Sequence, residues 1–162
     1  MVVAGPRGRY NRYHLMAAEI PVHRSKIVVP ALRPEVLRRE RLLVFLDELL
    51  EKKLLLVTAP AGYGKTTLLI DMAHATEMPV CWLALDALDR DPQRFIAYLI
   101  AALAWRFPRF GTRSAAALKR LTSFEQDSEQ LLATLINEVY DQIEEHFVLV
   151  LDDFQFVDSG GE

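Results

Sequence analysis

Short apolar runs and longer amphipathic stretches alternate along the 162-residue chain. Apolar runs of this length, rich in leucine and valine, are typical of strands buried on both faces of a parallel sheet. They lie at about 53–58, 80–85 and 147–151. In other stretches the apolar residues recur every three to four positions, which is the period of a helix with one buried face. These predict helices at about 34–50, 65–75, 92–107, 114–121 and 128–145.

The order of these elements predicts a fold class. Asp91 precedes Pro92 where the third of these helices begins. An acid there caps free backbone N–H groups, and proline suits the first helical turn. Strands that alternate with helices favour a three-layer α/β/α architecture around a mostly parallel sheet. We therefore expect an α/β fold.

A phosphate-binding loop is predicted between the first apolar run and the helix that follows it. Its residues are Ala59, Pro60, Ala61, Gly62, Tyr63, Gly64, Lys65, Thr66 and Thr67. The two glycines can take positive φ and leave room for phosphate oxygens, while backbone N–H groups and the helix N-terminus attract the anion. Lys65 can reach the β- and γ-phosphates, and the hydroxyl of Thr66 can bind Mg²⁺. Ala59 stands where the strict pattern has glycine, and we interpret it as a tolerated small residue.

Two acids at the end of the last apolar run give a second, independent signal. Asp152 and Asp153 follow Phe147–Leu151, at the carboxyl end of a predicted parallel strand, where open α/β sheets bind ligands. We expect Asp152 to hold the magnesium ion, directly or through water. Asp153 is expected to orient or deprotonate the attacking water. Alone this pattern is weak, but together with the upstream loop it predicts a nucleotide site.

Composition and charge narrow the function further. A net charge of −3 argues against direct nucleic acid binding through a broad basic face. The single cysteine, Cys81, lies in an apolar run, which favours a buried thiol and a reducing, cytoplasmic location. No apolar stretch reaches the length of a membrane span. Residues 1–24 are expected to be a flexible amino-terminal segment, with 1–15 disordered and translation beginning at Met16.

Several segments of the chain together resemble a known family. They are Ser25–Pro30, Arg38–Leu42, Thr58–Thr67, Trp82–Asp86, Asp91–Ala102 and Leu149–Asp153. They look like the amino-terminal ATPase module of the MalT-like regulators. These are large ATP-dependent transcriptional regulators with a LuxR-type helix-turn-helix at the carboxyl end, within the signal-transduction ATPases with numerous domains.

The resemblance implies a P-loop ATPase domain at 25–162, with a Walker A motif at 59–67 and a Walker B motif at 147–153. It implies ATP and Mg²⁺ as ligands, and Lys65 and Asp153 as the residues nearest the chemistry. Arg39 and Glu40 match an element that lies beside the nucleotide, although Arg38 replaces its glycine. They are either nucleotide neighbours or the charged face of the 34–50 helix. We assign no chemistry to Asp86 and Asp89.

The resemblance also implies an incomplete sheet. In this ATPase class, a later strand fills the slot between the phosphate-loop strand and the Asp-Asp strand. In regulators of this family, further helical repeats and the DNA-binding domain also follow that strand. We therefore expect a fragment of a longer regulator whose unpaired strand edges favour self-association. It would serve as an ATP-binding switch that hydrolyses ATP slowly as part of the longer protein.

Two other functions stay open at this point. One is a small-molecule kinase, in which the same loop transfers phosphate to an acceptor. The other is a non-catalytic interaction fragment with a vestigial loop.

Overall fold

The computed structural model describes residues 20–33, 38–50 and 52–157. Its helices are α1 (Arg24–Ile27), α2 (Glu40–Leu49), α3 (Lys65–Ala75), α4 (Pro92–Arg106), α5 (Thr112–Arg120) and α6 (Phe124–Gln142). The strands are β1 (Val80–Ala84) and β2 (Val148–Asp152), and two 3-10 helices, η3 (Ala87–Arg90) and η4 (Phe154–Phe156), follow them. None of the helices formed by these residues combines the length and apolarity needed to cross a bilayer.

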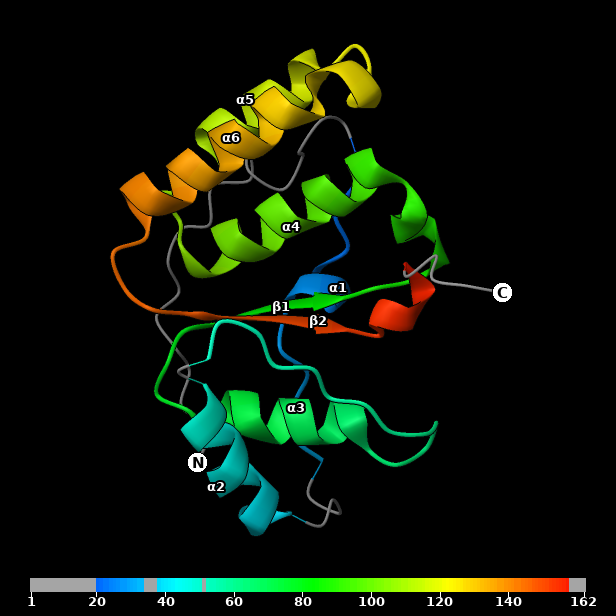
Figure 1. Ribbon diagram of the computed structural model, residues 1–162, viewed down its shortest axis with the longest axis vertical. Helices are drawn as coiled ribbons and strands as arrows, with labels where there is room; N and C mark the ends of the chain where they lie inside the picture. Colours follow the sequence, from blue (N-terminus) through cyan, green and yellow to red (C-terminus); the bar gives the residue numbers. More distant parts are fainter. Residues whose placement is uncertain (1–19, 34–37, 51, 158–162) are drawn as a thin grey trace.

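A two-stranded parallel sheet lies at the centre of the described structure. β1 and β2 pair in register from Val80 opposite Val148 to Ala84 opposite Asp152. Helices α4, α5 and α6 cover one side of the sheet, and α2 and α3 lie on the other (Figure 1). The predicted strands at 80–85 and 147–151, and a mixed α/β architecture with helices on both sides, are confirmed.

Side chains alternate across the sheet and fill a core on each side of it. Cys81 and Leu83 pack with α4, whereas Trp82 and Val150 pack with residues of α2 and α3. This alternation follows from the two-residue period of a strand. Burial raises the pKa of the Cys81 thiol to about 12, which keeps it protonated and agrees with a buried, unreactive cysteine.

The strand predicted at 53–58 is wrong. Residues 54–58 run as irregular chain, and Leu54 and Leu56 are 84% and 75% exposed. Within the described residues the sheet contains β1 and β2 alone, so this segment has no strand beside it. A strand forms only when a neighbour completes its ladder of hydrogen bonds, and apolar composition does not supply that neighbour.

The helices agree better with the sequence, because they depend on local contacts. The helix predicted at 65–75 is α3, and the Asp91 cap of α4 is confirmed by its side chain, which accepts from the Arg94 N–H at 2.8 Å. The first predicted helix begins later than expected, at Glu40, and residues 34–37 lie outside the described structure. On α6, which overlaps the helix predicted at about 128–145, Ile136 is apolar but 64% exposed.

The amino-terminal predictions fall mostly outside the described residues, which begin at Ile20. From there the chain is held against α4. The Tyr98 hydroxyl accepts a hydrogen bond from the His23 N–H and donates one to the Pro21 carbonyl, both at 3.3 Å. Ile27 follows in α1 and is fully buried beside Leu83. Residues 20–27 therefore form part of the core that supports the carboxyl end of β1.

Candidate functional site

The predicted phosphate-binding loop leads directly into α3. Gly62 and Gly64 have φ values of 82° and 79°, in the left-handed region that glycine adopts without a steric penalty. Gly64 is the N-cap residue of α3, and Lys65 is the first residue of the helix. The first N–H groups of α3 therefore lie at this loop and have no acceptors inside the helix, as expected for a helix that begins at Lys65.

The Lys65 side chain reaches back across the loop. Its Nζ donates to the Ala59 carbonyl at 2.7 Å and to the Pro60 carbonyl at 3.3 Å. The ammonium therefore lies over the loop that precedes α3, held by two of its carbonyls. A phosphate held by the loop N–H groups would meet this positive charge directly.

The two predicted magnesium ligands meet at the carboxyl end of β2. The Thr66 hydroxyl donates to Asp152 Oδ1 at 3.0 Å, although the residues are 86 positions apart. Asp152 is only 6% exposed. Burial, together with the nearby charge of Asp153, raises its pKa above the usual value, although the hydrogen bond from Thr66 opposes the shift. A hydroxyl beside a buried carboxylate is a set of hard oxygen donors of the kind Mg²⁺ prefers.

Thr66 and Asp152 would supply part of the coordination shell of a magnesium ion. The described residues contain no group of three or more histidine, cysteine or acidic side chains placed to hold a metal ion. Mg²⁺ commonly takes one or two protein ligands and completes its octahedron with phosphate oxygens and water. Thr66 and Asp152 therefore suit a magnesium ion that arrives with a nucleotide, and they do not form a complete protein site by themselves.

Asp153 adopts an unusual backbone conformation. It has a φ of 58°, the one positive value among the described residues other than glycine, and it precedes η4. Its Oδ1 accepts from Gln155 Nε2 at 2.9 Å. Left-handed backbone at a residue other than glycine is uncommon, but Asp and Asn adopt it more readily than most residues. The chain turns away from the sheet at this residue, so Asp152 and Asp153 have different surroundings.

Of the two predicted nucleotide neighbours, only Arg39 approaches the loop. Its guanidinium nitrogen lies 3.5 Å from the position that a Cβ on Gly64 would occupy. Glu40 is exposed on the first turn of α2, and within the described residues it makes no hydrogen bond or ion pair with the loop. The structure therefore brings Arg39 to the site and leaves Glu40 at the surface.

A buried charge cluster beyond the end of β1 was missed. Lys26 pairs with Asp86 at 2.9 Å and also with Asp89, and Arg94 Nε lies 3.1 Å from Asp89 Oδ1. The Asp89 side chain is fully buried. The hydrogen bond from Lys26 holds the pKa of Asp86 below its usual range. The i, i+3 spacing of the two acids is a capping-box signal that sequence analysis could have used.

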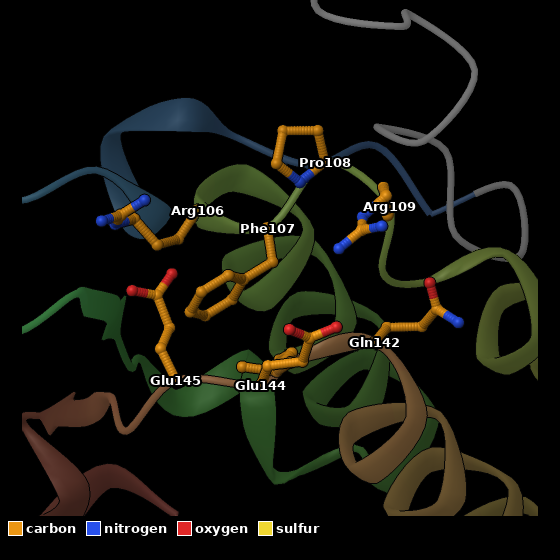
Figure 2. Close-up of a pocket in the computed structure, with 8 residues that line it drawn as sticks. Arg106, Phe107, Pro108, Arg109, Gln142, Glu144 and Glu145 are labelled. Atoms are coloured by element: carbon orange, nitrogen blue, oxygen red, sulfur yellow. The ribbon is translucent and has the colours of Figure 1, made fainter.

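The pocket drawn in Figure 2 lies away from the predicted site, near the residues that precede β2 rather than at the carboxyl end of that strand. It has a volume of about 380 Å³ and is formed where α4 and α6 end, beside the chain that enters β2. Its lining residues are Arg106, Phe107, Pro108, Arg109, Gln142, Ile143, Glu144 and Glu145. None of them belongs to the predicted site. Arginines and glutamates line it together, so it presents no single charge to a ligand (Figure 2).

The fold and the site thus define a mixed α/β protein in which a glycine-bearing turn, a helix N-terminus and a strand-end carboxylate meet. The chain is homologous to HTH-type transcriptional regulators named MalT. It is 34% identical to MalT of Klebsiella pneumoniae over 135 residues, which is 83% of this chain and 14% of that protein. It is 44% identical to MalT of Cronobacter sakazakii over 79 residues, which is 49% of this chain and 9% of that protein.

The relationship covers only part of each relative. MalT of Yersinia enterocolitica gives a similar match, 42% over 79 residues, or 9% of its length. The chain thus spans about 9–14% of the length of these relatives. No protein-family model matches the chain.

Proposed function

We propose that this chain is the nucleotide-binding switch module of a MalT-like transcriptional regulator, and that it binds Mg-ATP between the loop and Asp152. The hydrogen bond between Thr66 and Asp152 carries this proposal. It joins two side chains from distant segments, each of the type that holds magnesium in phosphate-loop proteins. The homology to transcriptional regulators named MalT supports the regulator part of the proposal.

The main chain would supply most of the phosphate contacts. The N–H groups of the loop and of the first turn of α3 bind the anionic oxygens, favoured by the helix dipole. Lys65 leaves its carbonyl acceptors, Ala59 and Pro60, and pairs with the β- and γ-phosphates. This exchange is favourable because an ion pair with the anionic phosphates replaces hydrogen bonds to two neutral carbonyls.

Thr66 and Asp152 would hold the magnesium ion. When bound, Mg²⁺ neutralises charge on the phosphates. Asp152 must be ionised to serve as a ligand. Burial disfavours the ionised form and raises the pKa of Asp152, and a bound magnesium ion would stabilise that form. Arg39 adds a second positive charge at the loop, next to Gly64.

Slow hydrolysis would reset the switch. Asp153 follows the metal-binding acid directly and orients or deprotonates the attacking water. Nucleotide state, inducer and self-association then bias a larger assembly that activates transcription. Helical repeats and a LuxR-type DNA-binding domain elsewhere in the regulator would carry the response to DNA.

Calorimetric titration with ATP and Mg²⁺ tests the proposal on the 162-residue chain. We expect Lys65→Ala to weaken binding roughly ten- to a hundred-fold, because it removes a charge-assisted contact. Lys119→Ala is the matched control, since Lys119 is an exposed lysine on α5. It should leave the affinity unchanged.

Two results would contradict the proposal. One is the absence of Mg-ATP binding by the wild-type chain, and the other is an unchanged affinity in a folded Lys65→Ala variant. Phosphate release is then measured with and without added small-molecule acceptors. Transfer to an acceptor in place of water would identify a kinase and not a switch.

A further inference from the structure

Arg38 links the start of α2 to a buried acid on α3. Its Nε lies 3.1 Å from Asp71 Oδ1. The Asp71 side chain is 4% exposed, whereas that of Arg38 is 58% exposed. Removing a carboxylate from water is unfavourable unless a cation or several hydrogen bonds compensate for it. The Arg38 guanidinium supplies such a cation for Asp71, although Arg38 itself lies at the surface.

Asp71 sits on the helix that begins at the loop. It lies between Ile70 and the buried Met72 of α3, which starts at Lys65. The packing of α2 against α3 through Leu46 and Met72 brings the two helices together. The ion pair adds a directional contact to this apolar packing, at the point where the chain enters α2.

The residue next to Arg38 faces the loop. Arg39 is the N-cap residue of α2, and its carbonyl accepts from the N–H groups of Leu42 and Leu43 at 2.8 and 3.1 Å. Its guanidinium lies against Gly64, with Cζ 3.9 Å from the position of a Cβ there. Neighbouring arginines thus have separate partners, one on the body of α3 and the other at its N-terminus.

We propose that Arg38 and Asp71 form a positioning pair that holds the Arg39 guanidinium against the loop, where it contacts the phosphates of the bound nucleotide. This inference rests on the proposed function. Ordering an arginine side chain at one site costs conformational entropy, and this cost is smaller when its backbone is already held in place. The ion pair of Arg38 with Asp71 holds the backbone next to Arg39. Arg38 therefore contributes to the nucleotide affinity although it lies outside the nucleotide site.

A double-mutant cycle measured by Mg-ATP titration tests this inference. Arg39→Ala should lower the affinity about tenfold, the loss expected for one charge-assisted contact. Arg38→Gln should lower it about three- to five-fold, because Arg39 remains but is no longer held. In the double variant the Arg38 effect should vanish, since a positioning residue has nothing left to position.

Further variants separate positioning from a general effect on folding. Asp71→Asn removes the same ion pair from the other side and should reproduce the affinity of Arg38→Gln. Arg41→Gln makes the same substitution at an exposed arginine of α2 and should change nothing. Thermal unfolding of each variant shows which are folded, and Asp71→Asn replaces Arg38→Gln in the cycle if the latter unfolds.

The outcomes distinguish this inference from the proposed function. If the wild type binds no Mg-ATP, or Lys65→Ala binds as tightly as the wild type, both are overturned. If binding depends on Lys65 while the Arg38 and Arg39 effects are additive, the positioning pair is wrong and the nucleotide site stands. An unchanged affinity in folded Arg38→Gln also overturns the pair alone.

Discussion

The Thr66 hydroxyl donates a hydrogen bond to Asp152 Oδ1 at 3.0 Å, and so joins the first turn of α3 to the end of β2. Nothing local brings these residues together. The contact exists because β2 pairs with β1 and α3 packs on the same face of the sheet as Trp82 and Val150. The predicted loop and the predicted acid therefore meet through tertiary structure.

A first prediction concerns magnesium. Thr66→Val keeps the shape of the side chain but removes the hydroxyl, so Mg-ATP should bind roughly tenfold more weakly, with no difference when EDTA removes the metal. Asp152→Asn should act in the same direction. Thr134→Val is the control, at a half-buried threonine of α6 whose hydroxyl donates to the Gln130 carbonyl. Equal losses with and without magnesium would show that these residues do not serve the metal.

A second prediction separates Asp153 from Asp152. Asp153→Asn should leave Mg-ATP affinity nearly unchanged and lower the rate of phosphate release roughly a hundred-fold, as expected when a general base is lost. Asparagine also tolerates the left-handed backbone at this position, where φ is 58°, so the variant should fold. Titration and single-turnover hydrolysis check the two expectations. If Asp153→Asn instead made ATP binding independent of magnesium, Asp153 would be the metal ligand and Asp152 would not.

A third prediction concerns the stability of α5. Burial raises the pKa of the Glu138 carboxyl, but hydrogen bonds from Ser114 and Arg113 outweigh this and leave the pKa below its usual value. The carboxylate accepts from the backbone N–H groups of Arg113 and Ser114 at 2.9 and 2.7 Å. Glu138→Gln should therefore lower the free energy of unfolding at pH 7 by about 1.5–3 kcal/mol, measured by denaturant unfolding.

The pH dependence of this contribution follows from the direction of the shift. A carboxyl group with a lowered folded-state pKa stabilises the protein above the pKa of the unfolded chain, about 4.3 for glutamate. The stabilisation is lost as the pH falls through the lower pKa of the folded protein. The difference between wild type and Glu138→Gln should therefore shrink below about pH 4.3. Glu129→Gln, at an exposed position on α6, should show neither effect.

A fourth prediction follows from the exposed leucines before the loop. Leu54 and Leu56 are 84% and 75% exposed, and within the described residues β2 pairs on one side only, with β1. Apolar segments and open strand edges of this kind favour association between chains. Sedimentation at tens of micromolar should therefore show oligomers, and Leu54→Lys with Leu56→Lys should shift the chain toward monomer.

The control for self-association uses another exposed apolar residue. Ile136 on α6 is 64% exposed and lies on a different element. Ile136→Lys should leave the oligomers intact. A monomeric wild-type chain would show that the chain does not self-associate. Dissociation by Ile136→Lys, but not by the two leucine substitutions, would place the interface on α6.

Features that rest on local physics could be predicted from the order of the amino acids. The glycines of the loop, the start of α3 at Lys65 and the Asp91 cap of α4 depend on residues within a few positions of one another. The two paired strands were also predictable. They are apolar enough to be buried, and each finds the other as its neighbour. The homology to MalT regulators agrees with the family that the loop and its surrounding motifs resemble.

Features that need a distant partner depend on how the chain folds in three dimensions. Residues 53–58 have the composition of a strand but no neighbour to pair with among the residues that the structure describes, so they remain irregular. Two further contacts join segments that sequence periodicity does not relate. One is the ion pair between Arg38 and Asp71, and the other is the capping of α5 by Glu138. Periodicity reports which face of an element is apolar. Whether a charge or a strand edge is satisfied depends on what the fold places beside it.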